Sequence, residues 1–135
     1  MLNRLTDSLD FQGQALMLRS ERQRLVASNI ANADTPGYVA RDINFAQALR
    51  NATGSGAPAA QLAASQARHI TSQTGTAGLG SALVYAAPSQ TNLDRNTVDM
   101  DRERASFTDN TVKYEATLRF ISANVRTTLT AITGQ

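Results

Sequence analysis

The chain has 135 residues, of which 41% are hydrophobic, and this length fits one domain with a modest core. Four Phe, three Tyr and no Trp leave few of the large side chains that usually anchor a core. The net charge of +2 is too small to indicate nucleic-acid binding, and the absence of cysteine excludes disulfides, thiol catalysis and thiolate metal sites.

Residues 1–50 are predicted to form a long helix, from about residue 3 to residue 32, and then an Asn-rich turn. Leu2, Leu9, Leu16 and Ile30 fall on one row with a seven-residue period, which Gln23 interrupts. Leu5 and Val26 fall on the neighbouring row, and Phe11, Leu18 and Leu25 form a third. One partner would not cover all three rows, so we expect the helix to contact more than one neighbour. The first 25 residues carry charges and no apolar run of about 7–15 residues, so we expect neither a secretory signal nor a membrane span.

A polar motif follows this helix and reads Asn29-Ile30-Ala31-Asn32-Ala33-Asp34-Thr35-Pro36-Gly37-Tyr38. Asn29 and Asn32 lie on one helical face, where their amides can bridge to a neighbouring backbone, and Asn32 and Asp34 can close the helix end. Pro36-Gly37 predicts a type II turn, because Pro fixes φ and Gly accepts a positive φ.

Residues 51–95 are predicted to be a flexible central arm, because Gly and Pro interrupt them too often for a long helix. Leu83–Ala86 has the composition of a short strand, and we expect at most a small β-hairpin with His69–Thr71. A weakly structured insertion of this length argues against a compact enzyme.

Residues 96–135 are predicted to form a second long helix, over about residues 99–133. Two apolar rows have a seven-residue spacing, the first with Met100, Phe107, Tyr114, Ile121 and Thr128 and the second with Thr111, Leu118, Val125 and Ile132. Asp99 or Thr97 is the candidate N-cap, and Gly134 ends the helix. We therefore predict a mostly α fold, in which residues 1–50 and 96–135 form one helical domain built on an antiparallel, coiled-coil-like pair of terminal helices.

The sequence indicates no catalytic, cofactor-binding or metal site. His69 is the only histidine, which rules out a multi-histidine metal site. Asp101 and Glu103 lie two residues apart on a helix and point to different sides, which does not suit a two-carboxylate mechanism. The mixed charges of Arg19, Glu21, Arg22 and Arg24 are typical of a solvated or inter-subunit face.

The motif from Asn29 to Tyr38 resembles the signature shared by flagellar rod and hook proteins. Its continuation Ala40-Arg41-Asp42-Ile43-Asn44-Phe45 and the segment Asn96-Thr97-Val98-Asp99-Met100-Asp101-Arg102-Glu103 are similar to the FlgB family of this group. One departure is Arg95, where that family usually has Gly. The resemblance implies a structural, non-enzymatic subunit of the proximal rod of the bacterial flagellar basal body, which assembles helically and transmits motor torque. The alternatives are another short rod protein such as FlgC, or a cytoplasmic export chaperone or adaptor.

The resemblance also implies partners and a location. The partners are further copies of the chain, the rod proteins FlgC, FlgF and FlgG, then FliE and the membrane-ring protein FliF, with no nucleic acid, cofactor or small-molecule substrate. Members of the family leave the cytoplasm through the flagellar type III export apparatus without a cleaved signal peptide, and the rod crosses the periplasm.

Two sets of residues are predicted to carry assembly. The motif residues Asn29, Asn32, Asp34, Thr35, Pro36, Gly37 and Tyr38 should set the exit of the first helix and contact neighbours. The helices should pack through Leu5, Leu9, Leu16, Val26, Ile30, Phe107, Tyr114, Leu118, Ile121 and Val125. Ordering costs about 1.5 kcal/mol per residue against about 25 cal/mol per Å² of apolar burial, so an isolated pair of helices should have little stability and should order on assembly.

Overall fold

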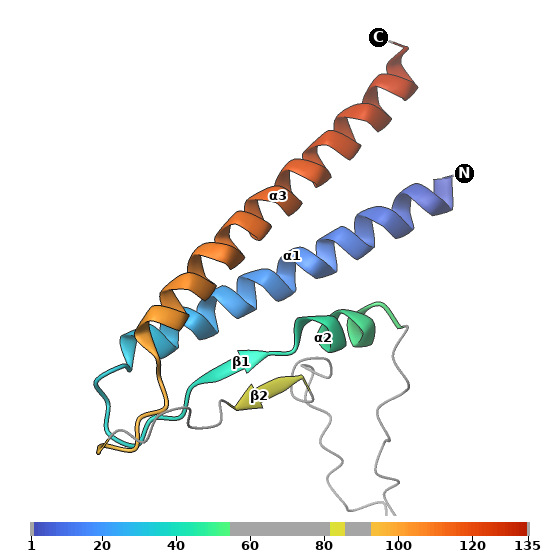
Figure 1. Ribbon diagram of the computed structural model, residues 1–135. Helices are drawn as coiled ribbons and strands as arrows, with labels where there is room; N and C mark the ends of the chain where they lie inside the picture. The colour runs from blue at the N-terminus through green and yellow to red at the C-terminus, as the bar shows by residue number, and fades with distance from the viewer. Residues whose placement is uncertain (1, 55–81, 86–92, 135) are drawn as a thin grey trace, which may run out of the picture.

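The computed structural model describes residues 2–54, 82–85 and 93–134. Its elements are, in chain order, α1 (Leu2–Ala31), β1 (Arg41–Ile43), α2 (Phe45–Ala52), β2 (Leu83–Tyr85) and α3 (Met100–Thr133). Figure 1 shows α1 and α3 as an antiparallel pair with both chain termini at the same end, and β1, β2 and α2 on the other side of α1. The predicted mostly helical fold with paired terminal helices is confirmed.

The helix ends follow the capping signals in the sequence. The Asp99 side chain accepts hydrogen bonds from the backbone N–H groups of Asp101 and Arg102, at 3.1 and 3.2 Å, and so caps α3. At the other end Gly134 has φ of 72° and donates its N–H to the carbonyl of Thr130, as expected where a helix ends in the left-handed conformation.

The short helix α2 and the strand β1 were not predicted from the sequence. The side chain of Asn44 caps α2 by accepting the N–H of Gln47 at 3.2 Å. β1 pairs with β2 in antiparallel register, with Arg41 opposite Tyr85 and Ile43 opposite Leu83. The strand expected near Leu83 is thus present, but its partner is β1, and the proposed partner His69–Thr71 lies outside the described residues.

The apolar core lies between α1 and the small sheet with α2. Leu18 and Leu25 of α1 are buried against Ile43 of β1, together with Ala48 and Ala82. Two small strands and an eight-residue helix therefore cover one face of α1, while α3 lies along another. Among the described residues, no helix is both long and apolar enough to cross a membrane.

Candidate assembly interface

Asn29, near the end of α1, joins three elements and is only 1% exposed. Its Nδ2 donates to the Arg41 carbonyl at 2.8 Å and to Oε2 of Glu103 at 3.1 Å. Its Oδ1 accepts the Arg41 N–H at 3.1 Å and the Tyr38 hydroxyl at 3.3 Å. The amide therefore pairs with both backbone groups of Arg41, as a neighbouring strand would, and this is the bridging expected from the sequence.

The end of α1 is closed by a second asparagine from far along the chain. Asn96, 5% exposed, donates through Nδ2 to the carbonyls of Asn32, Ala33 and Thr35 at 2.7–3.0 Å. These carbonyls belong to the turn that follows α1, so this side chain ties that turn to the segment before α3. Asn32 acts locally, because its Nδ2 donates to the Ser28 carbonyl at 2.8 Å. The sequence analysis did not identify the role of Asn96.

Pro36 and Gly37 form the predicted type II turn. Gly37 has φ of 72°, and the N–H of Tyr38 donates to the Thr35 carbonyl at 3.3 Å. The same turn is tied to the segment before α3, since the Gly37 N–H donates to the Asp94 carbonyl at 2.8 Å. In Figure 1 these two segments lie together at the end of the molecule opposite the termini.

Arg95 has φ of 54° and is the non-glycine residue with positive φ among the described residues. A side chain other than Gly costs free energy in this conformation because Cβ crowds the following carbonyl. Position 95, where the resemblance in sequence implies Gly, is therefore one where the backbone of this chain adopts the conformation that Gly favours.

The arginines predicted to form a solvated or inter-subunit face contact the chain itself. Arg22 pairs with Asp42 of β1 through two hydrogen bonds of 2.9 Å, which raise the pKa of the guanidinium above its ordinary value. Arg19 lies over the Phe45 ring, 4.5 Å from its centroid, and burial lowers the pKa of Arg19. Arg24 forms an ion pair with Glu21 on the same helix. Arg19 and Arg22 thus help to fix α2 and β1 on α1.

The face of α3 that meets α1 contains a polar row. Asn110, fully buried, donates through Nδ2 to the Arg19 carbonyl at 2.9 Å and to Oε1 of Gln23 at 2.6 Å. Asn124 donates to Oε1 of Gln12 at 3.2 Å. With Glu103, which contacts Asn29, these residues lie in one row with a seven-residue spacing, the same period as the apolar rows. That spacing is a signal that the sequence analysis missed.

The predicted packing residues divide between the inside and the outside of the helix pair. Val26 is buried, and Leu9, Leu16, Ile30, Tyr114 and Ile121 are partly buried. Phe107, Leu118 and Val125 are 37%, 40% and 50% exposed, and the side chain of Leu5 lies outside the described part of the structure. Further along α3, Leu129 and Ile132 are also exposed. Three of the nine described side chains of the predicted set, all on α3, therefore face solvent in the single chain.

The motif residues show a similar division. Asn29 is buried and Asn32 and Tyr38 are partly buried, whereas Asp34, Thr35, Pro36 and Gly37 are exposed. Within the described residues there is no group of three or more His, Cys, Asp or Glu side chains that could hold a metal ion. The described residues thus form a polar junction around Asn29 and Asn96 at one end of the helix pair and an exposed apolar row along α3. This arrangement is suited to contact with other helices.

Comparison with known proteins agrees with this arrangement. Residues 9–38, which cover most of α1 and the motif, match the family described as "Flagella basal body rod protein". A protein of Proteus mirabilis is 44% identical over 135 residues, covering 98% of each chain, and one of Escherichia coli K12 is 45% identical over 129 residues, covering 93% of each. A protein of Salmonella typhimurium is 42% identical over 137 residues, covering 99% of each. All three are named flagellar basal body rod protein FlgB, and the chain belongs to this FlgB family of flagellar basal body rod proteins.

Proposed function

We propose that this chain is a structural subunit of the proximal rod, where copies of it pack helically with other rod proteins and transmit motor torque. The observation that carries the proposal is the orientation of α3, which turns a polar row towards α1 and leaves the apolar row of Leu118, Val125 and Ile132 exposed. An apolar helix surface that is exposed in the single chain indicates an interface with another molecule.

The spacing of the exposed row indicates what covers it. Leu118, Val125 and Ile132 are seven residues apart, a period that matches the side chains of a second helix packed alongside. The row from Leu118 to Ile132 is about 21 Å long at 1.5 Å per residue, so its partner must be a helix of at least that length. Both α1, with 30 residues, and α3, with 34, are long enough, which favours copies or relatives of this chain as partners.

The proposed partners follow from the family. They are other copies of the chain and the rod proteins FlgC, FlgF and FlgG, with FliE and the membrane-ring protein FliF at the base. The chain would leave the cytoplasm through the flagellar type III export apparatus without a cleaved signal and would take its place in the rod that crosses the periplasm. We propose no catalytic role, cofactor or small-molecule substrate, because the amides of Asn29 and Asn96 and the carboxylate of Asp99 bridge or cap backbone groups of the chain itself.

The experiment that tests this function separates a rod subunit from a cytoplasmic export chaperone. Cells would be fractionated into cytoplasm and purified basal bodies, and the chain would be detected with an antibody in each fraction, with Ile121→Asp as a packing variant. The wild-type chain should be retained in basal bodies, and the variant should accumulate outside them because a half-buried packing position would carry a charge. A wild-type chain found in the cytoplasm alone would support the chaperone instead.

A further inference from the structure

The end of the molecule opposite the termini presents a leucine to solvent on a rigid support. Leu93 is 103% exposed, the highest value among the exposed large apolar side chains of the described residues. The backbone beside it is fixed, because the Asp94 carbonyl accepts the Gly37 N–H at 2.8 Å and the Thr97 N–H donates to the Tyr38 carbonyl at 3.1 Å. We call Asp34–Gly37 and Leu93–Arg95 together the tip.

The tip is also strained and carries two carboxylates beside the one arginine. Arg95 follows the leucine with φ of 54°, and backbone strain of this kind persists where the surroundings hold it and often marks a functional position. The carboxylates of Asp34 and Asp94 make no hydrogen bond or ion pair within the described residues. A fixed apolar side chain flanked by free carboxylates is suited to a pocket with an apolar floor and a basic rim.

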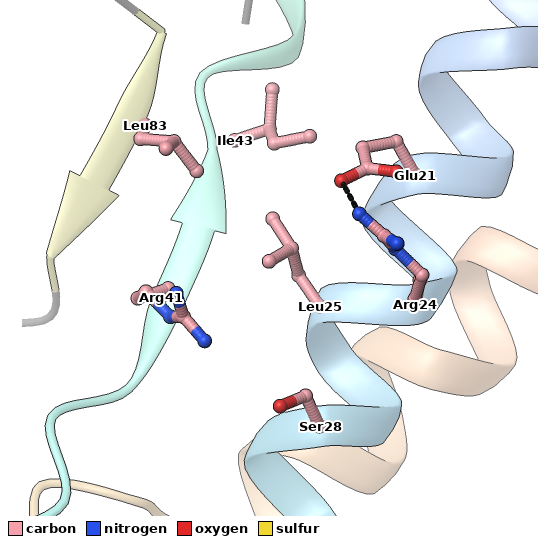
Figure 2. A pocket seen from close by; sticks show the side chains of 7 residues that line it. All are labelled: Glu21, Arg24, Leu25, Ser28, Arg41, Ile43 and Leu83. Atoms are coloured by element: carbon pink, nitrogen blue, oxygen red, sulfur yellow. Dashed lines mark hydrogen bonds and ion pairs between the residues drawn. The ribbon is translucent and has the colours of Figure 1, made fainter. Parts of the chain in front are cut away.

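The same chain carries such a pocket on another surface. A groove of about 410 Å³ lies between α1 and the two strands, and Leu25, Ile43 and Leu83 form its apolar part. Figure 2 shows these three side chains converging from the helix and from both strands, with Arg41 on β1 and Ser28 on α1 beside them. Arg24, paired with Glu21, completes the rim. We call this pocket the groove.

The guanidinium of Arg41 is available at the groove. The backbone of Arg41 is held by Asn29 through both its N–H and its carbonyl, whereas its side chain makes no hydrogen bond within the described residues. The Arg41 backbone is therefore fixed, and its guanidinium carries an unpaired charge. A carboxylate at this rim could pair with the Arg41 guanidinium without any change in the backbone of β1.

We propose that the groove of one copy of this chain receives the tip of a second copy, with Leu93 against Leu25, Ile43 and Leu83 and Asp94 beside Arg41. The proposal rests on the rod-subunit function and deepens it by naming one contact between copies. Because the tip and the groove are different surfaces, each copy can offer its own tip while its groove is filled. Such heterologous contacts continue from copy to copy and do not close on themselves at two subunits, as a helical rod requires.

The test uses the absence of cysteine in the chain. Full-length chains with Thr35→Cys, an exposed tip position that leaves Leu93 and Asp94 in place, and with Ser28→Cys are mixed at the highest concentration that stays in solution and treated with a short thiol-reactive cross-linker. The mixture should give a cross-linked dimer, because position 28 lines the groove. A matched control replaces Ser28→Cys with Ser8→Cys, an exposed position on α1 about 30 Å from residue 28 at 1.5 Å per residue. Equal dimer yields with both partners, or no dimer with Ser28→Cys, would overturn the proposal.

A charge exchange provides a second measurement. Arg41→Asp should lower the yield of the specific dimer about two- to fivefold, the effect of losing one exposed ion pair and adding repulsion, and Asp94→Arg in the partner should restore it. Failure of the exchange to restore the yield would count against the ion pair and hence against this seating of the tip. The fractionation of basal bodies reports the rod function independently, so a chain found in basal bodies without the specific cross-link would contradict this contact alone.

Discussion

Replacement of Asn29 by Ala should destabilise the fold more than removal of the amide of Asn124 from the same helix pair. In Asn29→Ala the N–H and the carbonyl of Arg41 lose their partner, and the Tyr38 hydroxyl and the Glu103 carboxylate lose theirs. A buried group left without a partner costs about 1–3 kcal/mol. Because Arg41 is partly exposed and water can reach part of its backbone, the total should be about 2–4 kcal/mol.

The control is Asn124→Ala, since Asn124 is also an amide on the helix pair but makes one longer bond, to Gln12 at 3.2 Å. Urea unfolding followed by circular dichroism gives the global effect, and amide hydrogen exchange at Arg41 gives the local one. Asn29→Ala should lower the urea midpoint clearly more than Asn124→Ala and should speed exchange of the Arg41 amide. If the two variants had equal midpoints and the Arg41 amide stayed protected, the bridging role of Asn29 would be refuted.

Three further substitutions test the backbone and the outer face. Gly37→Val should lower the free energy of unfolding by about 1–2 kcal/mol, because a side chain is strained at φ of 72° even where no atom lies close enough to clash with it. Gly13→Ala within α1 should raise the free energy of unfolding by about 0.5–1 kcal/mol. Thermal unfolding of both variants distinguishes backbone strain from a steric clash. Arg95→Gly should raise stability by about 1 kcal/mol or less, since relief of the positive φ exceeds the added chain entropy, and a lower melting temperature would show that the arginine side chain contributes more than its strain removes. Val125→Asp should keep the helix content and reduce incorporation into basal bodies about tenfold or more, while the exposed neighbour Arg126→Asp should have a smaller effect; equal incorporation of both variants would contradict an apolar contact at Val125.

The parts of the fold predicted from the sequence are those with local signals. The helices repeat apolar residues over many turns, Asp99 precedes acidic residues, and Pro36-Gly37 has few conformations open to it. The parts that were missed depend on contacts between distant segments. β1 and β2 have three residues each and pair across 39 intervening positions, from 44 to 82, which no local pattern can indicate.

The interior of the helix pair was missed for a different reason. Sequence analysis assigned the apolar rows to the contact between the helices, because apolar residues at seven-residue spacing usually form that contact. The structure also places Asn110 and Asn124 there, beside the partly buried Tyr114 and Ile121, and each of the two amides is bonded to a partner on α1. An assembling subunit can keep its apolar rows for other chains, and a single sequence does not distinguish the two uses. The assignment of Leu118 and Val125 to contacts between subunits stays a prediction.

The most direct test of the rod-subunit account is an in-frame deletion with basal bodies imaged by electron cryo-tomography, complemented by a tagged copy of the chain. The account predicts that the rod is lost above an intact membrane ring and that the tag in the complemented strain lies within the restored rod. Normal rods in the deletion strain, with the tag in the cytoplasm, would contradict it.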